Sequence, residues 1–181
     1  MRKNQLHSFR DAILAGWQEE FWASYPEESR GFFKATQDQF ANPVGSVFTR
    51  DSERLVDGLL SGCPGKDLKA DLEPMIRVRA VQELAPSQAV GFLLQLKAVA
   101  RAEVAKSGSS NELEHALSDF HEAVDRLLLV GFDMYTKCRE DIFSIRVKAV
   151  ENRSLKVMER LNEWRDRRSE RAESGVSDVD S

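Results

Sequence analysis

Hydrophobic residues recur at three- and four-residue intervals along most of the chain, and no stretch shows the alternation of a half-buried strand. The first such pattern runs from about Lys3 to Trp22. Its apolar residues fall on one helical face: Leu6, Phe9, Ile13, Trp17 and Phe21. We expect Tyr25-Pro26 to end this helix, because the residue before a proline is pushed out of the helical region.

Capping and turn residues mark three further helices. Asn42 is a favourable N-cap, and a proline follows it at the first helical position, which predicts a helix from Pro43 to Leu60. Two more helices are predicted over Lys69–Glu83 and Pro86–Lys106, the second closed by Gly108. Their predicted inward residues are Val44, Val47, Phe48, Leu55, Val56, Leu59, Leu72, Met75, Ile76, Val81, Ala89, Phe92, Leu93, Leu96, Val99 and Ala100.

The last predicted helix is unusually long. Ser109 and Glu112 have the spacing of a capping box. No proline follows them, and between Glu112 and Gly175 the only glycine is Gly131. One helix from Ser110 to about Arg168 would measure about 90 Å at 1.5 Å per residue. Its first half is expected to pack on the preceding helices through Leu113, Leu117, Phe120, Val124, Leu127 and Tyr135. We therefore predict an all-α helical sensor domain over residues 1–140, a projecting coiled-coil-like helix over 141–170 and a disordered acidic tail over 171–181.

The projecting part of this helix carries a regular apolar seam. Seven residues follow one another at spacings of four and three, namely Phe143, Val147, Val150, Ser154, Val157, Leu161 and Trp164. This 3.5-residue period is typical of a coiled coil, in which the seam faces a partner helix. A homodimer is therefore predicted, with a surface for a separate protein partner. The alternative is a single amphipathic helix that folds back on its own domain.

Composition and charge narrow the possible functions. Apolar residues make up 41% of the chain, the net charge is −4 and the pI is about 5.5, which argues against general nucleic-acid binding. The longest apolar run, Leu127–Phe132, is too short to span a membrane, and the N-terminus lacks the features of a secretion signal. Cys63 and Cys138 are far apart and are expected to be reduced. We expect a cytoplasmic protein.

No catalytic motif or cofactor motif is found. The sequence contains no glycine-rich phosphate loop, no GxSxG and no HExxH. His115 and His121 are six residues apart on one helix and cannot share a metal ion, and helix Pro86–Lys106 has no histidine that could bind haem. We therefore expect no metal, no cofactor and no enzymatic activity.

One polar cluster is a candidate site. Arg77 and Arg79 differ by about 200° around a helix, so one of them should point toward the domain. An inward arginine needs a partner, because an isolated buried charge is costly. With Gln82 and Gln88, these arginines form either a structural polar cluster or a site for an anionic ligand.

Several segments resemble a known family. They are Phe40–Gly45 (FANPVG), Ile76–Gln82 (IRVRAVQ), Ala85–Ala89 (APSQA) and Leu96-Lys97. Over roughly residues 5–145 the chain resembles the RsbR/RsbRD-type N-terminal domain of stressosome co-antagonist proteins. The resemblance implies a globin-like helical bundle without haem, dimeric through its last helix, with a long helix that transmits signals to a C-terminal STAS domain. No STAS-like segment follows the long helix in this chain, so we expect a separate partner to dock on Lys148 to Arg171 instead.

Two functions compete at this point. The first is a regulatory sensor or signalling adaptor that dimerises and acts on a separate partner through its C-terminal helix. The second is an accessory or structural subunit of a larger redox or respiratory complex.

Overall fold

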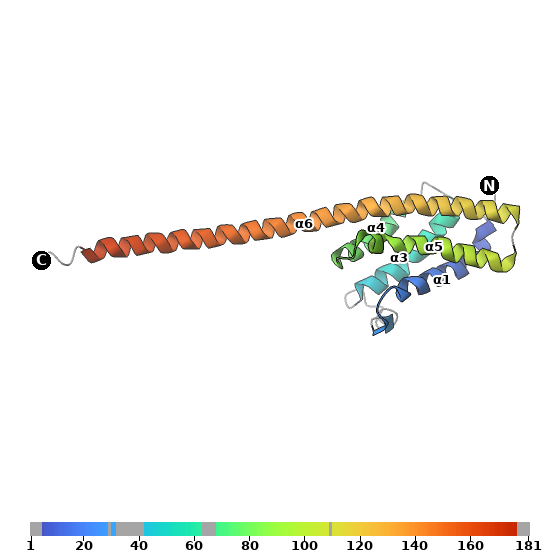
Figure 1. Ribbon diagram of the computed structural model, residues 1–181, viewed down its shortest axis with the longest axis horizontal. Coiled ribbons are helices and arrows are strands. Elements are labelled where there is room, and N and C mark those ends of the chain that lie inside the picture. Colours follow the sequence, from blue (N-terminus) through green and yellow to red (C-terminus); the bar gives the residue numbers. More distant parts are fainter. Residues whose placement is uncertain (1–4, 29, 32–41, 63–67, 109, 177–181) are drawn as a thin grey trace. The chain divides into compact units, whose positions relative to one another are not determined.

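The computed structural model describes residues 5–28, 30–31, 42–62, 68–108 and 110–176. Helices account for most of them, and no strand occurs among these residues, which confirms the all-α fold class (Figure 1). A 3₁₀ helix η1 (Gln5–Phe9) precedes the α-helices α1 (Arg10–Ala23), α3 (Pro43–Leu60), α4 (Leu68–Val81), α5 (Pro86–Ser107) and α6 (Asn111–Val176). The chain divides into two units, Met1–Arg139 and Glu140–Ser181, and α6 contributes to both.

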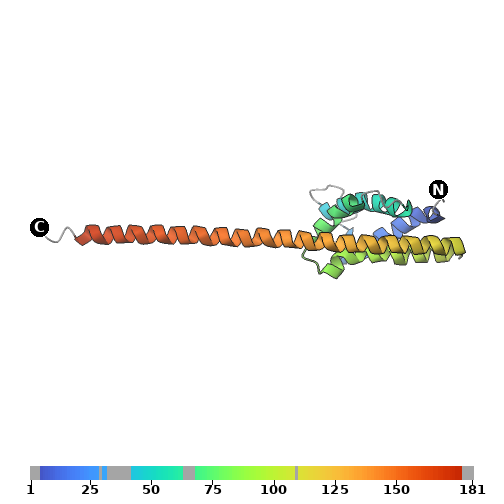
Figure 2. The ribbon, with the colours of Figure 1, turned by 90° about the horizontal axis from the view of Figure 1, so that it is seen from above.

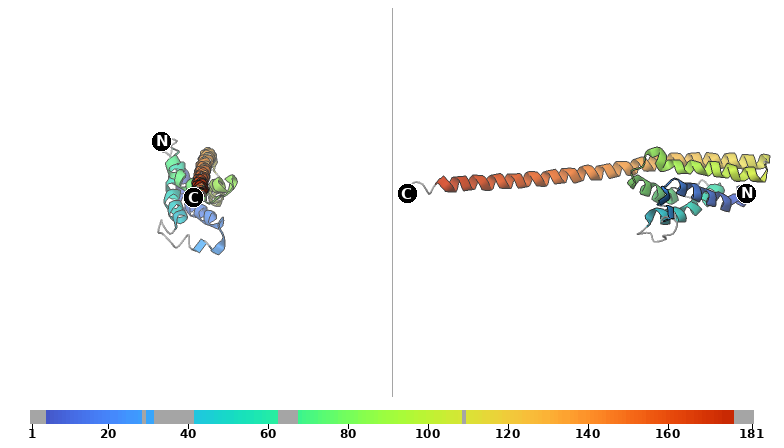
Figure 3. Two further views of the ribbon diagram at one scale, coloured as in Figure 1. Left: turned by 90° about the vertical axis from the view of Figure 1, so that its left-hand side faces the viewer. Right: turned by 60° about the horizontal axis from the view of Figure 1, so that its bottom comes forward.

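In the first unit, α5 and the adjoining part of α6 run antiparallel and side by side (Figures 1 and 2). Helices α1, α3 and α4 pack together on one side of this pair (Figure 3). The most extensive packing joins α3 to α4, α1 to α5 and α1 to α3. This arrangement surrounds one hydrophobic core with five helices or helix segments.

Local capping explains where the helices start and stop. The side chain of Asn42 accepts a hydrogen bond from the backbone N–H of Gly45 (2.8 Å), as predicted for the start of α3. Gly108 ends α5 with a φ of 84°, a conformation that suits glycine. The predicted capping box of α6 includes Ser109, which lies outside the described residues. In the described part, the hydroxyl oxygen of Ser110 accepts a hydrogen bond from the backbone N–H of Leu113, at 3.2 Å.

An aromatic cluster fills the centre of the first unit. Trp17 of α1 stacks on Phe92 of α5, with ring centroids 5.9 Å apart, and its indole N–H donates to the Phe92 carbonyl oxygen at 2.8 Å. Phe21 of α1 stacks on Phe48 of α3. All four side chains are buried. Because these pairs join α1 to α3 and α5, the cluster fixes how the three helices cross.

The predicted packing of the first part of α6 is confirmed. Leu113, Leu117, Phe120, Val124, Leu127 and Tyr135 are all buried. Gly131 lets α6 come close to the other helices, because a Cβ there would lie 3.3 Å from Leu72 of α4 and 3.4 Å from Leu93 of α5. A small residue is therefore suited to this position, even though glycine weakens a helix.

The structure differs from the sequence prediction at three places. Val81 was expected to face inward but is 70% exposed, because the inward line of α4 passes through Ile76, Arg79 and Ala80 and the helix ends at Val81. The first predicted helix begins with the 3₁₀ segment η1. Helix α6 continues to Val176, past its predicted end near Arg168, and residues 177–181 of the predicted tail lie outside the described residues.

Candidate functional sites

Arg79 of α4 is a buried cation in the core of the first unit, with only 5% of its surface exposed. Its guanidinium donates three hydrogen bonds: Nε to the Ala89 carbonyl (3.0 Å), Nη2 to the Gln88 carbonyl (2.8 Å) and Nη1 to the Tyr25 hydroxyl (3.0 Å). It also lies 5.0 Å from the ring centroid of Phe21 and 5.1 Å from that of Phe92. The burial lowers the pKa of Arg79 from its ordinary value.

The other members of the predicted polar cluster have different surroundings. Arg77 is exposed and pairs with Glu73 one turn earlier on α4, at 2.7 Å. The side-chain oxygen of Gln82 accepts a hydrogen bond from the Tyr25 hydroxyl (3.3 Å). The side-chain oxygen of Gln88 accepts one from the backbone N–H of Ala85 (3.1 Å) and so caps α5. Arg79 and Gln82 thus meet at Tyr25, whereas Arg77 and the Gln88 side chain do not take part in that contact.

Two side chains of α6 donate hydrogen bonds to backbone carbonyls at the end of α4 and in the turn between α4 and α5. The Tyr135 hydroxyl donates to the Leu84 carbonyl, and Nη1 of Arg139 donates to the Ala80 carbonyl (3.2 Å). Together with the bonds of Arg79, they connect residues 79–89 to Tyr25, just after α1, and to α6. Two of the segments that carry the family resemblance therefore lie where three helices are joined.

Buried polar residues on α3 form a contact that sequence reasoning missed. Asp51 is almost fully buried, and its carboxylate accepts two hydrogen bonds from Arg50, at 2.6 and 2.9 Å. This pairing raises the pKa of Arg50. Ser52 is also buried and accepts a hydrogen bond from Gln18 of α1 (2.9 Å). The signal available in the sequence was the position of Asp51 and Ser52 within the inward stretch between Phe48 and Leu55.

The predicted seam lies in the second unit, where every described side chain is exposed except that of Ile142. The apolar seam residues keep between 37% and 68% of their surface exposed in the single chain. They are Phe143, Val147, Val150, Val157, Leu161 and Trp164. The guanidinium of Arg168 stacks on the Trp164 ring, 5.2 Å from its centroid. The helix thus presents an uncovered apolar line.

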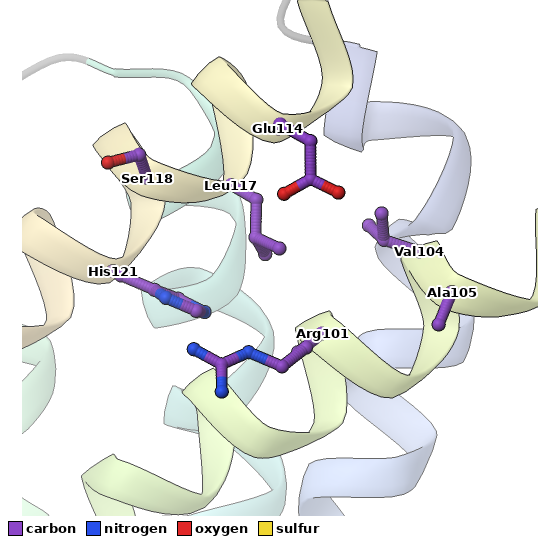
Figure 4. Close-up of a pocket in the computed structure, with 7 residues that line it drawn as sticks. All are labelled: Arg101, Val104, Ala105, Glu114, Leu117, Ser118 and His121. Carbon is purple, nitrogen blue, oxygen red and sulfur yellow. The ribbon is translucent and has the colours of Figure 1, made fainter. Parts of the chain in front are cut away.

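A hollow of about 360 Å³ lies between α5 and α6 in the first unit. Figure 4 shows Arg101 and His121 together at one end of it and Glu114 at the other. Nε2 of His121 lies 3.1 Å from the carbonyl oxygen of Lys97, and desolvation lowers the pKa of this histidine. The Ser118 hydroxyl points away from the His121 ring (Figure 4), so these two residues do not form a nucleophile–base pair.

The described residues contain no group of three His, Cys, Asp or Glu side chains that could hold a metal ion. Cys138 is half-buried on α6, and Cys63 lies outside the described part of the chain. No described helix is both long enough and apolar enough to cross a membrane.

Comparison with known proteins gives one match. The family model of the RsbT co-antagonist protein rsbRD N-terminal domain matches residues 11–150. No STAS domain is found in the 181 residues. No curated protein and no solved structure matches the chain. The match includes most of the first unit and the beginning of the seam. The chain therefore belongs to the RsbT co-antagonist protein rsbRD N-terminal domain family.

Proposed function

We propose that this protein is a regulatory sensor or adaptor that forms a homodimer through its C-terminal helix and passes a signal along that helix to a separate protein partner. The family supports a stressosome-related signalling role, because its description names a co-antagonist. That description favours regulation over enzymatic catalysis and over the accessory subunit of a redox complex.

The exposed seam is the observation that carries this proposal. Six large apolar side chains at coiled-coil spacing are left in water by the single chain. Complete burial of such a side chain stabilises by about 1.5–3 kcal/mol. Burial of six partly exposed ones on each chain can offset an association cost of about 4–15 kcal/mol. Two-fold dimers are the commonest closed assemblies, so a second copy is the simplest cover for the seam.

A parallel pair suits a signalling role. In that arrangement both sensor domains lie at one end of the helix pair and both output ends lie at the other. Ser154 interrupts the seam with a small polar residue, and Asn152-Arg153-Ser154 contains weak helix formers. The pair is therefore weakest near residue 154, which leaves the segment after it accessible to a partner.

The oligomeric state of the full-length protein tests the proposal. The double variant Val147→Asp, Val150→Asp places charges on the part of the seam that precedes Ser154 and should convert a dimer to a monomer at tens of micromolar. The matched control is Ile145→Asp, Leu155→Asp, which adds the same charges at exposed positions outside the seam and should remain dimeric. Light scattering coupled to gel filtration measures the mass of each. A wild-type monomer, or equal loss of the dimer in both variants, would refute dimerisation through the seam.

A further inference from the structure

The seam is bordered by arginine at every step along one edge. With Phe143, Val150, Val157 and Trp164 at the d positions of a heptad, the g positions are Arg146, Arg153, Arg160 and Arg167. The e positions on the other edge are Ser144, Glu151, Met158 and Arg165. Residues seven apart on a helix lie almost in line. The four arginines therefore form a continuous basic edge, called here the g edge, and all of them are exposed.

Apart from Glu151 on the e edge, the acidic residues among residues 146–167 lie away from the seam. Glu159 and Asp166 occupy f positions and Glu163 occupies a c position, on the face opposite the seam. Arg167 pairs within the helix with Glu163, at 3.9 Å, but both side chains are about 69% exposed. Exposed pairs of this kind contribute little stability. Arg167 can therefore exchange this exposed pair for a carboxylate of a partner helix.

A second copy of this helix would place opposite charges against the g edge at only some positions. In a parallel pair each g residue faces the e residue of the next heptad on the other helix, so Arg146 would meet Glu151 of the second copy. Farther along, Arg160 would meet Arg165 and the like charges repel. An antiparallel pair would oppose g to g, which brings arginine against arginine throughout. Valine at d, as at Val157, also packs poorly in a parallel two-stranded coil.

We infer that residues 157–168 dock an acidic amphipathic helix of a partner protein, with its apolar face on Val157, Leu161 and Trp164 and its carboxylates against the arginines of the g edge. This inference takes from the proposed function that the seam receives a partner, and adds the chemistry of that partner. Self-repulsion at Arg160 and Arg165 keeps this end of a dimer open, and the same arginines select an acidic ligand.

Nucleic acid and anionic membrane fit the surface less well. Either would be recognised by basic residues spread over a broad face. Here four arginines border a narrow apolar line, and on the opposite face Lys148 and Lys156 alternate with Glu159, Glu163 and Asp166. An acidic helix on the seam stays away from Glu159 and Asp166, and at Arg167 it replaces the exposed pair with Glu163.

A matched pair of synthetic peptides provides the test. Both are amphipathic helices about four heptads long with leucine at a and d; one has glutamate and the other lysine at e and g. Fluorescence anisotropy with the full-length protein should show at least about tenfold tighter binding of the glutamate peptide at low salt. That preference should shrink as salt rises from about 50 mM to about 500 mM.

Two charge-reversal variants locate the binding surface. Arg160→Glu, Arg167→Glu should abolish or invert the preference for the glutamate peptide. Lys148→Glu, Lys156→Glu makes the same change in net charge at b and c positions and should preserve the preference. Equal effects of the two variants, or no preference in the wild type, would overturn the inference. So would tighter binding of duplex DNA or phosphatidylserine vesicles in the same assay.

The outcome is distinguishable from failure of the proposed dimer. A protein that is monomeric by light scattering but still selects the glutamate peptide through Arg160 and Arg167 contradicts dimerisation and supports the acidic partner. A stable dimer that binds neither peptide supports dimerisation and contradicts the acidic partner.

Discussion

Replacement of Arg79 tests whether its buried guanidinium holds α1, α4 and α5 together. In Arg79→Met the side chain keeps a similar length but becomes uncharged and apolar, so it loses all three hydrogen bonds and the guanidinium contacts with the Phe21 and Phe92 rings. The matched control is Arg77→Met, which removes an exposed arginine from the same helix. Surface changes of that kind usually alter stability by no more than about 0.5 kcal/mol.

The loss of stability expected for Arg79→Met is the difference between opposing contributions to the free energy of unfolding. Three charge-assisted hydrogen bonds stabilise by about 1.5 kcal/mol each at the low end, and a desolvated cation–π contact adds about 2 kcal/mol. Removal of the charge also recovers several kcal/mol of desolvation cost. We therefore expect Arg79→Met to lower the free energy of unfolding by about 2 kcal/mol. Arg79→Lys should be at least as damaging, because it keeps a buried charge but loses the planar guanidinium that bonds three acceptors.

Urea unfolding followed by tryptophan fluorescence measures these differences. The chain has three tryptophans, and a Trp164→Phe background leaves the signal to Trp17 and Trp22 of the first unit. The expected order of stability is wild type, then Arg79→Met, then Arg79→Lys, with Arg77→Met close to wild type. If Arg79→Met were as stable as wild type, the guanidinium would contribute nothing net. If Arg79→Lys were the milder change, charge rather than hydrogen-bond geometry would explain the role of Arg79.

Three further changes probe individual features of the first unit. Glu83 has a φ of 58°, so Glu83→Gly should raise the free energy of unfolding in urea by relieving backbone strain. Ala102→Gly, at an exposed position inside α5, should lower that free energy by about 1 kcal/mol. Asn42→Ala removes the cap of α3 and should cost about 1–2 kcal/mol in the same assay, whereas Asn42→Asp should cost less. Burial lowers the pKa of His121, so the folded state resists protonation; stability should be full above about pH 6.5 and fall as the pH drops through that value. Melting temperatures between pH 7.5 and 5.5 should therefore fall more for wild type than for His121→Gln, and equal slopes would contradict this assignment.

Most of the helices could be predicted because their signals are local. Asn42 caps the amide of Gly45, three residues on, and Gly108 ends α5 through its own φ, so each boundary depends on neighbouring residues alone. Hydrophobic periodicity likewise identified the buried face of α6. Val81 was misplaced because it is apolar and near that period, while the true inward position is taken by Arg79. A charged residue is buried there only because suitable acceptors are present.

Those acceptors could not be predicted from the sequence. The carbonyls of Gln88 and Ala89 become available only when α5 turns back against α4, and Tyr25 lies 54 residues earlier, just after α1. Tertiary structure therefore decides whether an arginine at this position is an exposed ligand-binding group or an internal cross-link. The same holds for Asp51, whose burial depends on the packing of α3 against its neighbours.

The g edge, unlike the surroundings of Arg79, can be found from the sequence alone. It becomes visible only when the residues are placed on heptad positions. Counted as composition, the acids and bases of residues 146–167 interleave and indicate an ordinary solvated helix. Placed on heptad positions, they separate by edge: the arginines at every seventh residue from Arg146 to Arg167 border one edge of the apolar line. Glu151 lies on the other edge, and Glu159, Glu163 and Asp166 lie away from the seam. Since side chains at e and g set partner choice in coiled coils, this separation bears on specificity rather than on solubility. The variant Glu159→Arg, Arg160→Glu exchanges two neighbouring residues. It keeps the composition and the net charge and moves one arginine off the g edge. It should lose part of the preference for the glutamate peptide while retaining its helix content by circular dichroism, and an unchanged preference would show that the register of the arginines does not matter.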